Sequence, residues 1–280
     1  MAAVVVTGAG SGIGRAAALR LRALGFDVFA GVRRETGPDT WPGAGPGRIV
    51  PLPLDVTDPA AIAAAAGRVR AELAGGRLAG LVNNAGIAVA APLEFLPPDE
   101  LRRQLEVNVV GQLAVTQAFL PLLREGSGRI VNLGSLSGRV ALPFLGPYAA
   151  SKFALRALND ALRVELRPSG VTVSLIEAGN IATPLWESSA AAARGLAGGF
   201  PPEALARYGP AMERLGDRAA GFSQTGMPVE RAVEVVIHAL TAPRPRAHYM
   251  VAEGGRLWAN RLVQGLPSGL RDRLIRMSLR

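Results

Sequence analysis

Short apolar runs rich in β-branched residues alternate along this chain with longer segments of helical period, and this alternation limits the fold more than any other feature. Strands separated by helices pair in parallel, so the pattern predicts βαβ units around one sheet. We expect strands near 3–7, 27–32, 49–53, 79–83, 129–134, 171–177 and 247–251, and helices near 13–24, 58–74, 98–124, 148–166 and 228–241. The predicted fold is α/β, a doubly wound parallel sheet of seven strands with helices on both faces.

No linker or repeat divides the chain, so we expect a single domain over residues 1–255. Residues 184–227 differ from the rest because they are rich in Ala, Gly and Pro, with short helical pieces such as 202–215. They follow the sixth predicted strand, at the carboxyl edge of the sheet where ligands bind in such folds. We interpret 184–227 as a substrate lid; a plain surface excursion is the alternative.

A glycine-rich loop, Thr7-Gly-Ala-Gly-Ser-Gly-Ile-Gly14, joins the first predicted strand to the first helix. Glycines at such positions allow a tight turn, close approach of the backbone to a pyrophosphate and close helix–strand packing. The helix N-terminus adds amide donors and the positive end of a dipole. The strand–loop–helix context predicts a Rossmann-type dinucleotide site. The residues expected to contact it are Gly8, Ser11, Gly12, Ile13 and Gly14.

The end of the second predicted strand bears on which cofactor binds. Val32 is followed by Arg33 and Arg34, with no carboxylate where one would bind a ribose 2′-hydroxyl. Arginine pairs with a 2′-phosphate, which a carboxylate would repel. The sequence therefore favours NADP(H) over NAD(H), although these arginines are two among thirty in the chain and NAD(H) stays open.

Tyr148 and Lys152 form the clearest chemical pair, and Lys152 is the only lysine in the chain. Residues four apart share a helix face, so the ammonium should lie beside the phenol. A tyrosine titrates near ~10, and an adjacent cation favours the phenolate, so we expect Lys152 to lower the pKa of Tyr148. The pair therefore predicts a general acid/base.

Polar residues on neighbouring elements offer partners for this pair. Ser135, at the end of the fifth predicted strand, could hold a substrate oxygen beside Tyr148, and Ser137 is a competitor that spacing does not exclude. Asn108 stands in an apolar stretch of the predicted helix 98–124. It either bends that helix or anchors a water linked to Lys152. The segment 83–86, Asn-Asn-Ala-Gly, could also be a plain turn.

Over residues 2–184 the chain resembles the short-chain dehydrogenase/reductase family in the order and spacing of several residues. They are the glycine loop, Asp55, the 83–86 segment, Asn108, Ser135, Tyr148 and Lys152. The resemblance implies that Tyr148 is the general acid/base, Lys152 lowers its pKa and holds ribose, Ser135 positions the carbonyl oxygen and Asn108 supports a proton relay. It implies cofactor contacts from Asp55, Val56, Asn83, Ala85 and Gly86 on the adenine and ribose side, and from Gly179, Ile181 and Thr183 on the carboxamide side, besides Tyr148 and Lys152.

One position departs from the family pattern, in which Pro-Gly follows the sixth strand. This chain has Ala178-Gly179 instead. Losing proline frees a backbone angle, which puts the rigidity of this loop in doubt but removes no catalytic group.

The stretches 146–155 and 176–186 are similar to the hydroxysteroid and retinol dehydrogenase branch of the family. That similarity implies a bulky apolar substrate, with a secondary alcohol and ketone, or a primary alcohol and aldehyde, interconverted by hydride transfer. The expected pocket residues are Ser135, Leu142, Phe144, Tyr148, Leu185 and Trp186. The main alternative is a catalytically silent NADP(H)-binding scaffold or sensor.

The net charge of +9 comes from arginines scattered singly along the chain, with no nucleic-acid fold signature. With no cysteine and two histidines we expect no metal site, and with no apolar run near ~20 residues or signal peptide we expect a cytoplasmic protein.

Residues 256–280 form a basic amphipathic extension with six arginines, one aspartate and an apolar stripe. We favour docking of this extension on its own domain or on a neighbouring subunit over contact with a membrane surface. The family resemblance implies a homodimer or homotetramer.

Overall fold

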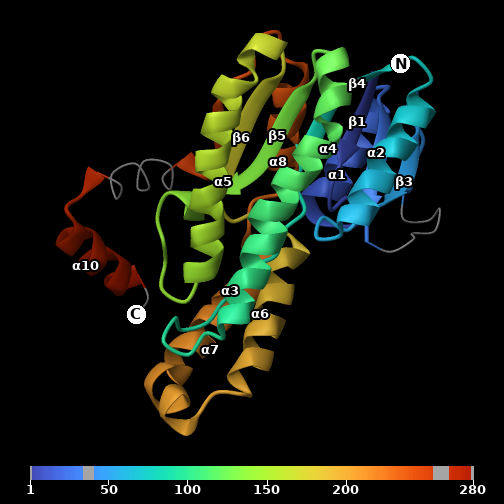
Figure 1. The fold of residues 1–280 in the computed structure, drawn as a ribbon. Coiled ribbons are helices and arrows are strands. Elements are labelled where there is room, and N and C mark those ends of the chain that lie inside the picture. Colours follow the sequence, from blue (N-terminus) through green and yellow to red (C-terminus); the bar gives the residue numbers. More distant parts are fainter. Residues whose placement is uncertain (1, 34–40, 255–264, 279–280) are drawn as a thin grey trace.

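The computed structural model describes residues 2–33, 41–254 and 265–278, and in this part of the chain one sheet of seven parallel strands forms the centre (Figure 1). The strand order is β3-β2-β1-β4-β5-β6-β7. The strands are β1 (Ala2–Val6), β2 (Asp27–Val32), β3 (Ile49–Pro53), β4 (Arg77–Asn83), β5 (Arg129–Ser135), β6 (Thr172–Ala178) and β7 (His248–Val251). The predicted α/β fold is confirmed, and each strand begins and ends within two residues of its prediction.

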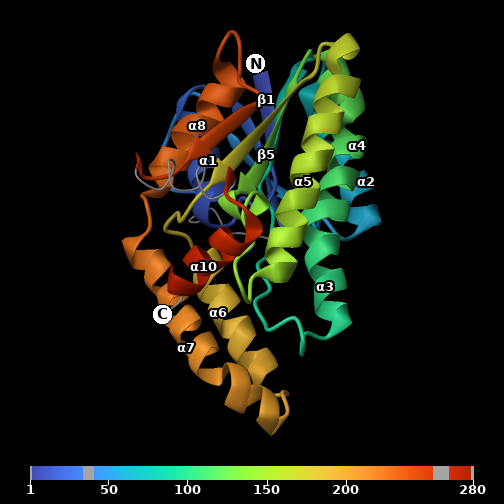
Figure 2. The same cartoon turned by 90° about the vertical axis from the view of Figure 1, so that its left-hand side faces the viewer.

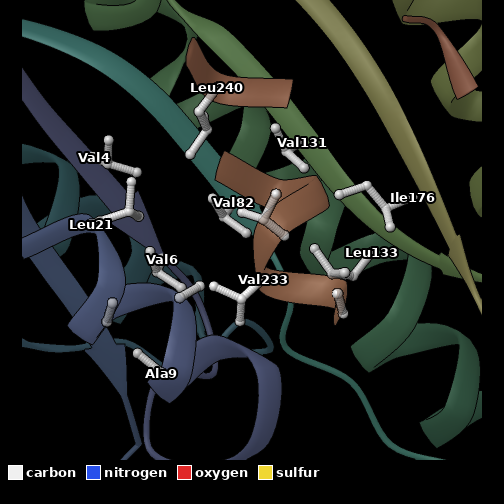
Figure 3. Close-up of a cluster of buried hydrophobic side chains, with 14 of the residues drawn as sticks. Val4, Val6, Ala9, Leu21, Val82, Val131, Leu133, Ile176, Val233 and Leu240 are labelled. Atoms are coloured by element: carbon white, nitrogen blue, oxygen red, sulfur yellow. The ribbon is translucent and has the colours of Figure 1, made fainter. Parts of the chain in front are cut away.

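Helices cover both faces of this sheet, as Figures 1 and 2 show. One face is covered by α1 (Gly12–Ala23) and α8 (Val229–Thr241), and the other by α2 (Pro59–Leu73), α4 (Gly111–Glu125) and α5 (Gly146–Glu165). Successive residues of a strand point to opposite faces. In β1, Val4 and Val6 therefore enter the core under α1 and α8, which Figure 3 shows, whereas Ala3 and Val5 enter the core on the other face.

The predicted helix 98–124 has an irregular middle. The chain is helical from α3 (Pro98–Leu105) through a π turn (Glu106–Val110) into α4. A π turn adds one residue to a helical turn and is frequent at functional sites. Asn108 lies inside this turn and is fully buried.

By length and composition this helix is also long and apolar enough to cross a membrane, which differs from our reading of the sequence. In the fold, its α4 part packs on the sheet through residues such as Val115, Phe119 and Leu123. The apolar character of this segment thus has a structural cause, the core on the α2–α4–α5 face.

Beyond the carboxyl ends of the strands, α6 (Pro184–Ala197) and α7 (Pro202–Thr225) form a helical pair (Figures 1 and 2). The expectation of only short helical pieces was wrong, because α7 alone has 24 residues. Glycine and proline lower the intrinsic helix propensity of this segment, and packing between the two helices overrides that preference.

A polar and aromatic contact ties α7 to the loop between β4 and α3. The Glu94 carboxylate accepts hydrogen bonds from Arg207 at 2.8 Å and from the Tyr208 hydroxyl at 2.6 Å. Phe95 lies beside Phe200 and Tyr208, with ring centres 6.2 and 6.1 Å apart. This contact joins the helical pair to the loop that follows β4.

The described part of the extension ends in α10 (Ser268–Ser278). Its Leu270, Leu274 and Met277 side chains are 48%, 41% and 61% exposed, so the chain's own domain does not cover this part of the apolar stripe. The stripe residues at 255–264 lie outside the described residues.

Candidate active site

The strand order reverses between β1 and β4, and the loops after these two strands meet at the carboxyl edge of the sheet. The Asn84 side chain donates hydrogen bonds to the carbonyl oxygens of Thr7 and Gly8 at 3.0 and 3.1 Å. In return, the Thr7 hydroxyl accepts from the backbone amides of Asn84 and Ala85, both at 3.0 Å. The 83–86 segment is therefore more than a turn, because it is hydrogen-bonded to the glycine loop.

The glycine loop has the geometry that a pyrophosphate requires. Gly8 and Gly12 have positive φ angles of 61° and 53°, which side chains with a Cβ rarely adopt. A Cβ on Gly14 would collide with the Asn84 side chain and the Gly8 carbonyl group. The Ser11 side chain makes no capping bond to α1, so it leaves the first-turn amides uncapped.

Amide donors at a helix N-terminus fit a phosphate group, so the donor set suits a dinucleotide. The pyrophosphate of such a dinucleotide would be held by Gly8, Ser11, Gly12, Ile13 and Gly14.

Arg33 follows β2 and is exposed, whereas Arg34 lies outside the described residues. Across the end of β3, Asp55 accepts hydrogen bonds from the backbone amide and hydroxyl of Thr57 at 2.9 and 2.7 Å. These bonds, and to a smaller extent the charge of Arg33, hold the pKa of Asp55 below its usual value. The next residue, Val56, is buried in the core. Arg33 and Asp55 thus form a polar edge where an adenosine ribose would lie.

The side chain of Asn83 joins β4 to its neighbours in the core. Its side chain is buried and donates to the Thr116 hydroxyl and to Asn132 Oδ1, both at 2.9 Å. Its amide nitrogen is thus engaged between the sheet and α4, and the contact of Asn83 with the adenine and ribose side of a cofactor stays a prediction. Asn84, which the sequence pattern did not single out, is the residue at the glycine loop.

Tyr148 and Lys152 lie one turn apart near the start of α5, as their spacing requires. Both side chains are buried, and Lys152 Nζ lies 5.7 Å from the centre of the Tyr148 ring. The ammonium donates a 2.7 Å hydrogen bond to the carbonyl oxygen of Leu133 on β5. Ser135, at the end of β5, lies close enough to Tyr148 for its hydroxyl to lower the pKa of the phenol, and it accepts the Ser137 amide at 3.1 Å. Of the two candidate serines, Ser135 is therefore the one at the phenol.

The pKa of Tyr148 moves opposite to the expected direction. Burial raises it, and the hydrogen bond with Ser135 only partly offsets that effect. Burial also lowers the pKa of Lys152 to about 8. Both shifts have one cause, since removal from water disfavours the charged form of either group. The expected lowering of the Tyr148 pKa is therefore wrong for this structure, in which the effect of burial exceeds that of the Ser135 hydroxyl.

Asn108 faces the segment after β4 rather than the ammonium. Its Oδ1 accepts the Ile87 amide at 2.9 Å, and its Nδ2 donates to the Ile87 carbonyl at 2.9 Å and to the Ser151 hydroxyl at 3.1 Å. Gly86 passes close by, where a Cβ would come within 3.3 Å of Asn108 Oδ1. The side chain thus joins the π turn to two elements of the site.

The loop after β6 reaches the glycine loop. A Cβ on Gly12 would lie 3.3 Å from Cγ2 of Thr183. Ile181 is buried in the core and pairs with Met227 in an isolated bridge. Ala178 pairs with Ser135 and Val251 as the last residue of β6.

Ala178, which stands where the family pattern has proline, ends β6 and is followed by a residue bonded to β7. The amide of the next residue, Gly179, donates to the Val251 carbonyl at 2.8 Å. This bond continues the pairing of β6 with β7 by one residue beyond Ala178.

A cavity of about 190 Å³ opens beside Ser135 and Gly179. Of the residues expected in a substrate pocket, Leu142 and Trp186 line it together with Ser135. Tyr148 and Leu185 pack against Trp186 in the adjoining cluster. Phe144 does not line it, because its ring packs against Tyr208 with centres 6.0 Å apart.

Several residues that line this cavity were missed by the sequence patterns. They are Leu136, Val140, Asn180, Met227, Ala252 and Glu253. Met227 lies far along the chain from the motifs and reaches the cavity only through the Ile181 bridge. No local pattern marks such a residue.

Comparison with known proteins agrees with this geometry. Residues 2–194 match the short chain dehydrogenase family. The chain is 37% identical to the 3-amino-tetrahydro-pyrrolizinone reductase of Xenorhabdus hominickii over 92% of this chain and 89% of that protein. It is 38% identical to human 17-beta-hydroxysteroid dehydrogenase type 1 (89% and 77% covered) and 36% identical to mouse retinol dehydrogenase 5 (88% and 79%).

Among solved structures, a short chain dehydrogenase from Burkholderia cenocepacia in complex with NADP superposes with a TM-score of 0.68. It is 28% identical, with 93% of this chain and 92% of that chain covered. The predicted family and its hydroxysteroid- and retinol-dehydrogenase-like relatives are confirmed. The chain therefore belongs to the short-chain dehydrogenase/reductase family and is an NAD(P)-dependent oxidoreductase.

Proposed function

We propose that this enzyme uses NADP(H) to interconvert a secondary alcohol and a ketone, or a primary alcohol and an aldehyde, on a bulky apolar substrate. One observation carries the proposal. The Tyr148 phenol lies within the influence of the Ser135 hydroxyl and next to the only lysine of the chain, and its ring packs against Trp186, which lines the cavity with Ser135. A proton donor, an oxygen-positioning hydroxyl and an apolar wall thus converge at one place.

In the reduction direction, the bound nicotinamide would supply a hydride to the carbonyl carbon. Tyr148 would donate its proton to the carbonyl oxygen, which the Ser135 hydroxyl would hold in place. The Lys152 ammonium would stabilise the phenolate that remains, until a proton from solvent restores the phenol. The pKa shifts agree with these roles, because burial keeps Tyr148 protonated before the reaction. The predicted relay would pass Asn108, whose Oδ1 accepts the Ile87 amide and has a second lone pair.

The choice of NADP(H) rests on Arg33. It is exposed at the end of β2, and it is close enough to Asp55 for its charge to affect that carboxyl. A guanidinium at this edge can pair with a 2′-phosphate.

The size and character of the substrate rest on the cavity and on the relatives. Leu136, Val140, Leu142, Trp186 and Met227 give the cavity an apolar wall. Two relatives are named for hydroxysteroid and retinol chemistry. We assign 184–227 as the lid over this substrate, since Trp186 and Met227 both belong to it. We also retain a cytoplasmic homodimer or homotetramer as part of the proposal.

The test is NADPH oxidation by the purified protein with a 17-oxosteroid, retinal and 3-oxobutyrate, repeated with NADH. We expect turnover with at least one of the two bulky carbonyl compounds, little with 3-oxobutyrate and a higher kcat/KM with NADPH. NADPH binding without turnover of any compound would instead identify a catalytically silent NADP(H) scaffold or sensor. Turnover of 3-oxobutyrate alone would refute the substrate class but not the reaction.

A further inference from the structure

Gln104, on α3, is fully buried, and all of its side-chain hydrogen-bonding groups face the site rather than its own helix. Its Oε1 accepts the backbone amide of Val89 at 2.7 Å. Its Nε2 donates to the carbonyl oxygen of Ile87 at 2.9 Å and makes a longer, 3.5 Å contact with the Ser151 hydroxyl. A buried carboxamide with each polar atom engaged holds its partners at fixed separations.

Asn108, four residues further along, binds two of the same groups. Both carboxamides donate to the Ile87 carbonyl and to the Ser151 hydroxyl. Ser151 in turn donates to the carbonyl oxygen of Tyr148 at 2.7 Å. The result is a closed, buried network that joins α3, the π turn, residues 87–89 and the first turns of α5.

The segment held by this network forms part of the site. Ala88, between the two anchored residues Ile87 and Val89, is buried in one cluster with Tyr148 and Trp186. The Tyr148 and Trp186 rings have centres 6.2 Å apart. Any shift of residues 87–89 would therefore change the space around the phenol.

We infer that Gln104 is a positioning residue for the proposed reaction. Together with Asn108 it clamps residues 87–89 against the start of α5 and thereby fixes Tyr148 relative to the substrate cavity. The inference rests on the proposed function for its effect on turnover, but the clamp itself is a property of the fold. The two carboxamide oxygens have different partners, because Asn108 accepts the Ile87 amide whereas Gln104 accepts the Val89 amide, beyond Ala88. The side chain of Gln104 thus supplies the hydrogen bond on the Val89 side of Ala88, and Asn108 supplies its bonds on the Ile87 side.

The experiment compares Gln104→Met, which keeps the length of the side chain but none of its hydrogen bonds, with Gln104→Asn, which keeps the carboxamide on a shorter stem. Gln117→Met is the matched control, since Gln117 is an exposed glutamine on α4. For each variant we would measure the melting temperature, the NADPH dissociation constant by fluorescence, kcat and KM with the best carbonyl substrate, and amide exchange over residues 85–91.

For Gln104→Met we expect kcat to fall roughly 10- to 100-fold, as misplacement of a reacting group by about 1 Å would cause. The NADPH dissociation constant should stay within about twofold of the wild type, and the Val89 amide should exchange faster. Gln104→Asn should lose less, and Gln117→Met should match the wild type. A folded Gln104→Met protein with kcat within about twofold of the wild type would overturn the inference. So would a loss confined to NADPH affinity.

Two further outcomes are also decisive. If Gln104→Met does not fold, Gln104→Asn is judged by the same criteria. If the wild type turns over none of the carbonyl compounds, the proposed function fails, and amide exchange alone then decides the clamp. Unchanged exchange of residues 85–91 in a folded Gln104 variant would refute it.

Discussion

Lys152 Nζ lies 5.7 Å from the centre of the Tyr148 ring, and the ammonium is held there by a hydrogen bond to the Leu133 carbonyl rather than by a carboxylate. Within the described residues no carboxylate pairs with this positive charge, which is therefore able to stabilise a phenolate. Removal of the ammonium from water is unfavourable, and this desolvation lowers the pKa of Lys152. We therefore expect mutation of Tyr148 to change turnover and mutation of Lys152 to change the pH dependence of stability.

Tyr148→Phe should lower kcat by about 10²- to 10⁴-fold, because the ring stays in place while the proton donor is lost. The NADPH dissociation constant should change less than about twofold, since binding energy comes mainly from contacts to phosphate and ribose. Steady-state kinetics and a fluorescence titration give both numbers. Tyr249→Phe is the matched control. Its hydroxyl is hydrogen-bonded to His238 and the Arg246 amide, away from the cavity, so it should cost stability but keep turnover. Retained turnover in Tyr148→Phe would refute the assigned role.

Lys152 should make stability depend on pH. The unfolded chain keeps the lysine proton up to the ordinary pKa of 10.5, whereas the folded protein releases it near 8. Between these values the unfolded state binds more protons, so the free energy of unfolding rises with pH. The unfavourable contribution of Lys152 is complete below pH 8 and is relieved above it.

The measurement is urea unfolding of the wild type and Lys152→Met between pH 7 and 9.5. The stability of the wild type relative to the variant should increase with pH, approaching about 3 kcal/mol if the full window could be covered. A difference that stays constant over this range would contradict the buried, protonated ammonium at neutral pH.

Arg33→Ala should weaken NADPH binding about tenfold or more and leave NADH binding nearly unchanged, because only NADPH carries the 2′-phosphate that a guanidinium can pair with. Dissociation constants for both nucleotides give the comparison. Arg20→Ala removes the same charge from the exposed side of α1 and should affect neither. Equal weakening of both nucleotides by Arg33→Ala would remove the basis for the NADP(H) preference.

The Arg139–Glu177 ion pair should matter far more for stability than its distance alone suggests. Arg139 Nε and Nη2 each lie 2.6 Å from a different oxygen of Glu177, whose side chain is 1% exposed. Arg139→Leu leaves that carboxylate buried with weaker partners, Arg156 at 3.9 Å and His248 at 3.7 Å. The free energy of unfolding should fall by roughly 3 kcal/mol.

The matched control is Arg102→Leu. Arg102 makes an equally short 2.6 Å pair with Asp99, but both side chains are highly exposed, so the expected loss is below about 0.5 kcal/mol. Chemical denaturation of the two variants tests this contrast. Equal losses would show that burial does not set the strength of these pairs.

Much of this protein could be predicted from short-range patterns. The runs of β-branched residues gave all seven strands, and the four-residue spacing of Tyr148 and Lys152 gave their shared helix face. The length of α7 was underestimated, because glycine and proline weaken the local helical signal while the contact with α6 stabilises the helix. The direction of the Tyr148 pKa shift was also mispredicted, since burial is not visible in the sequence.

The sequence by itself determined the order of strands and helices, the glycine loop that follows β1 and the identity of the reactive side chains. These depend on residues within one or two turns of each other, where backbone geometry fixes which side chains are neighbours. Only the tertiary structure decided that Asn84 rather than Asn83 binds the glycine loop, that Met227 lines the cavity and that Gln104 clamps residues 87–89. Those contacts join elements far apart in the chain, and they form because packing of the whole sheet brings their ends together.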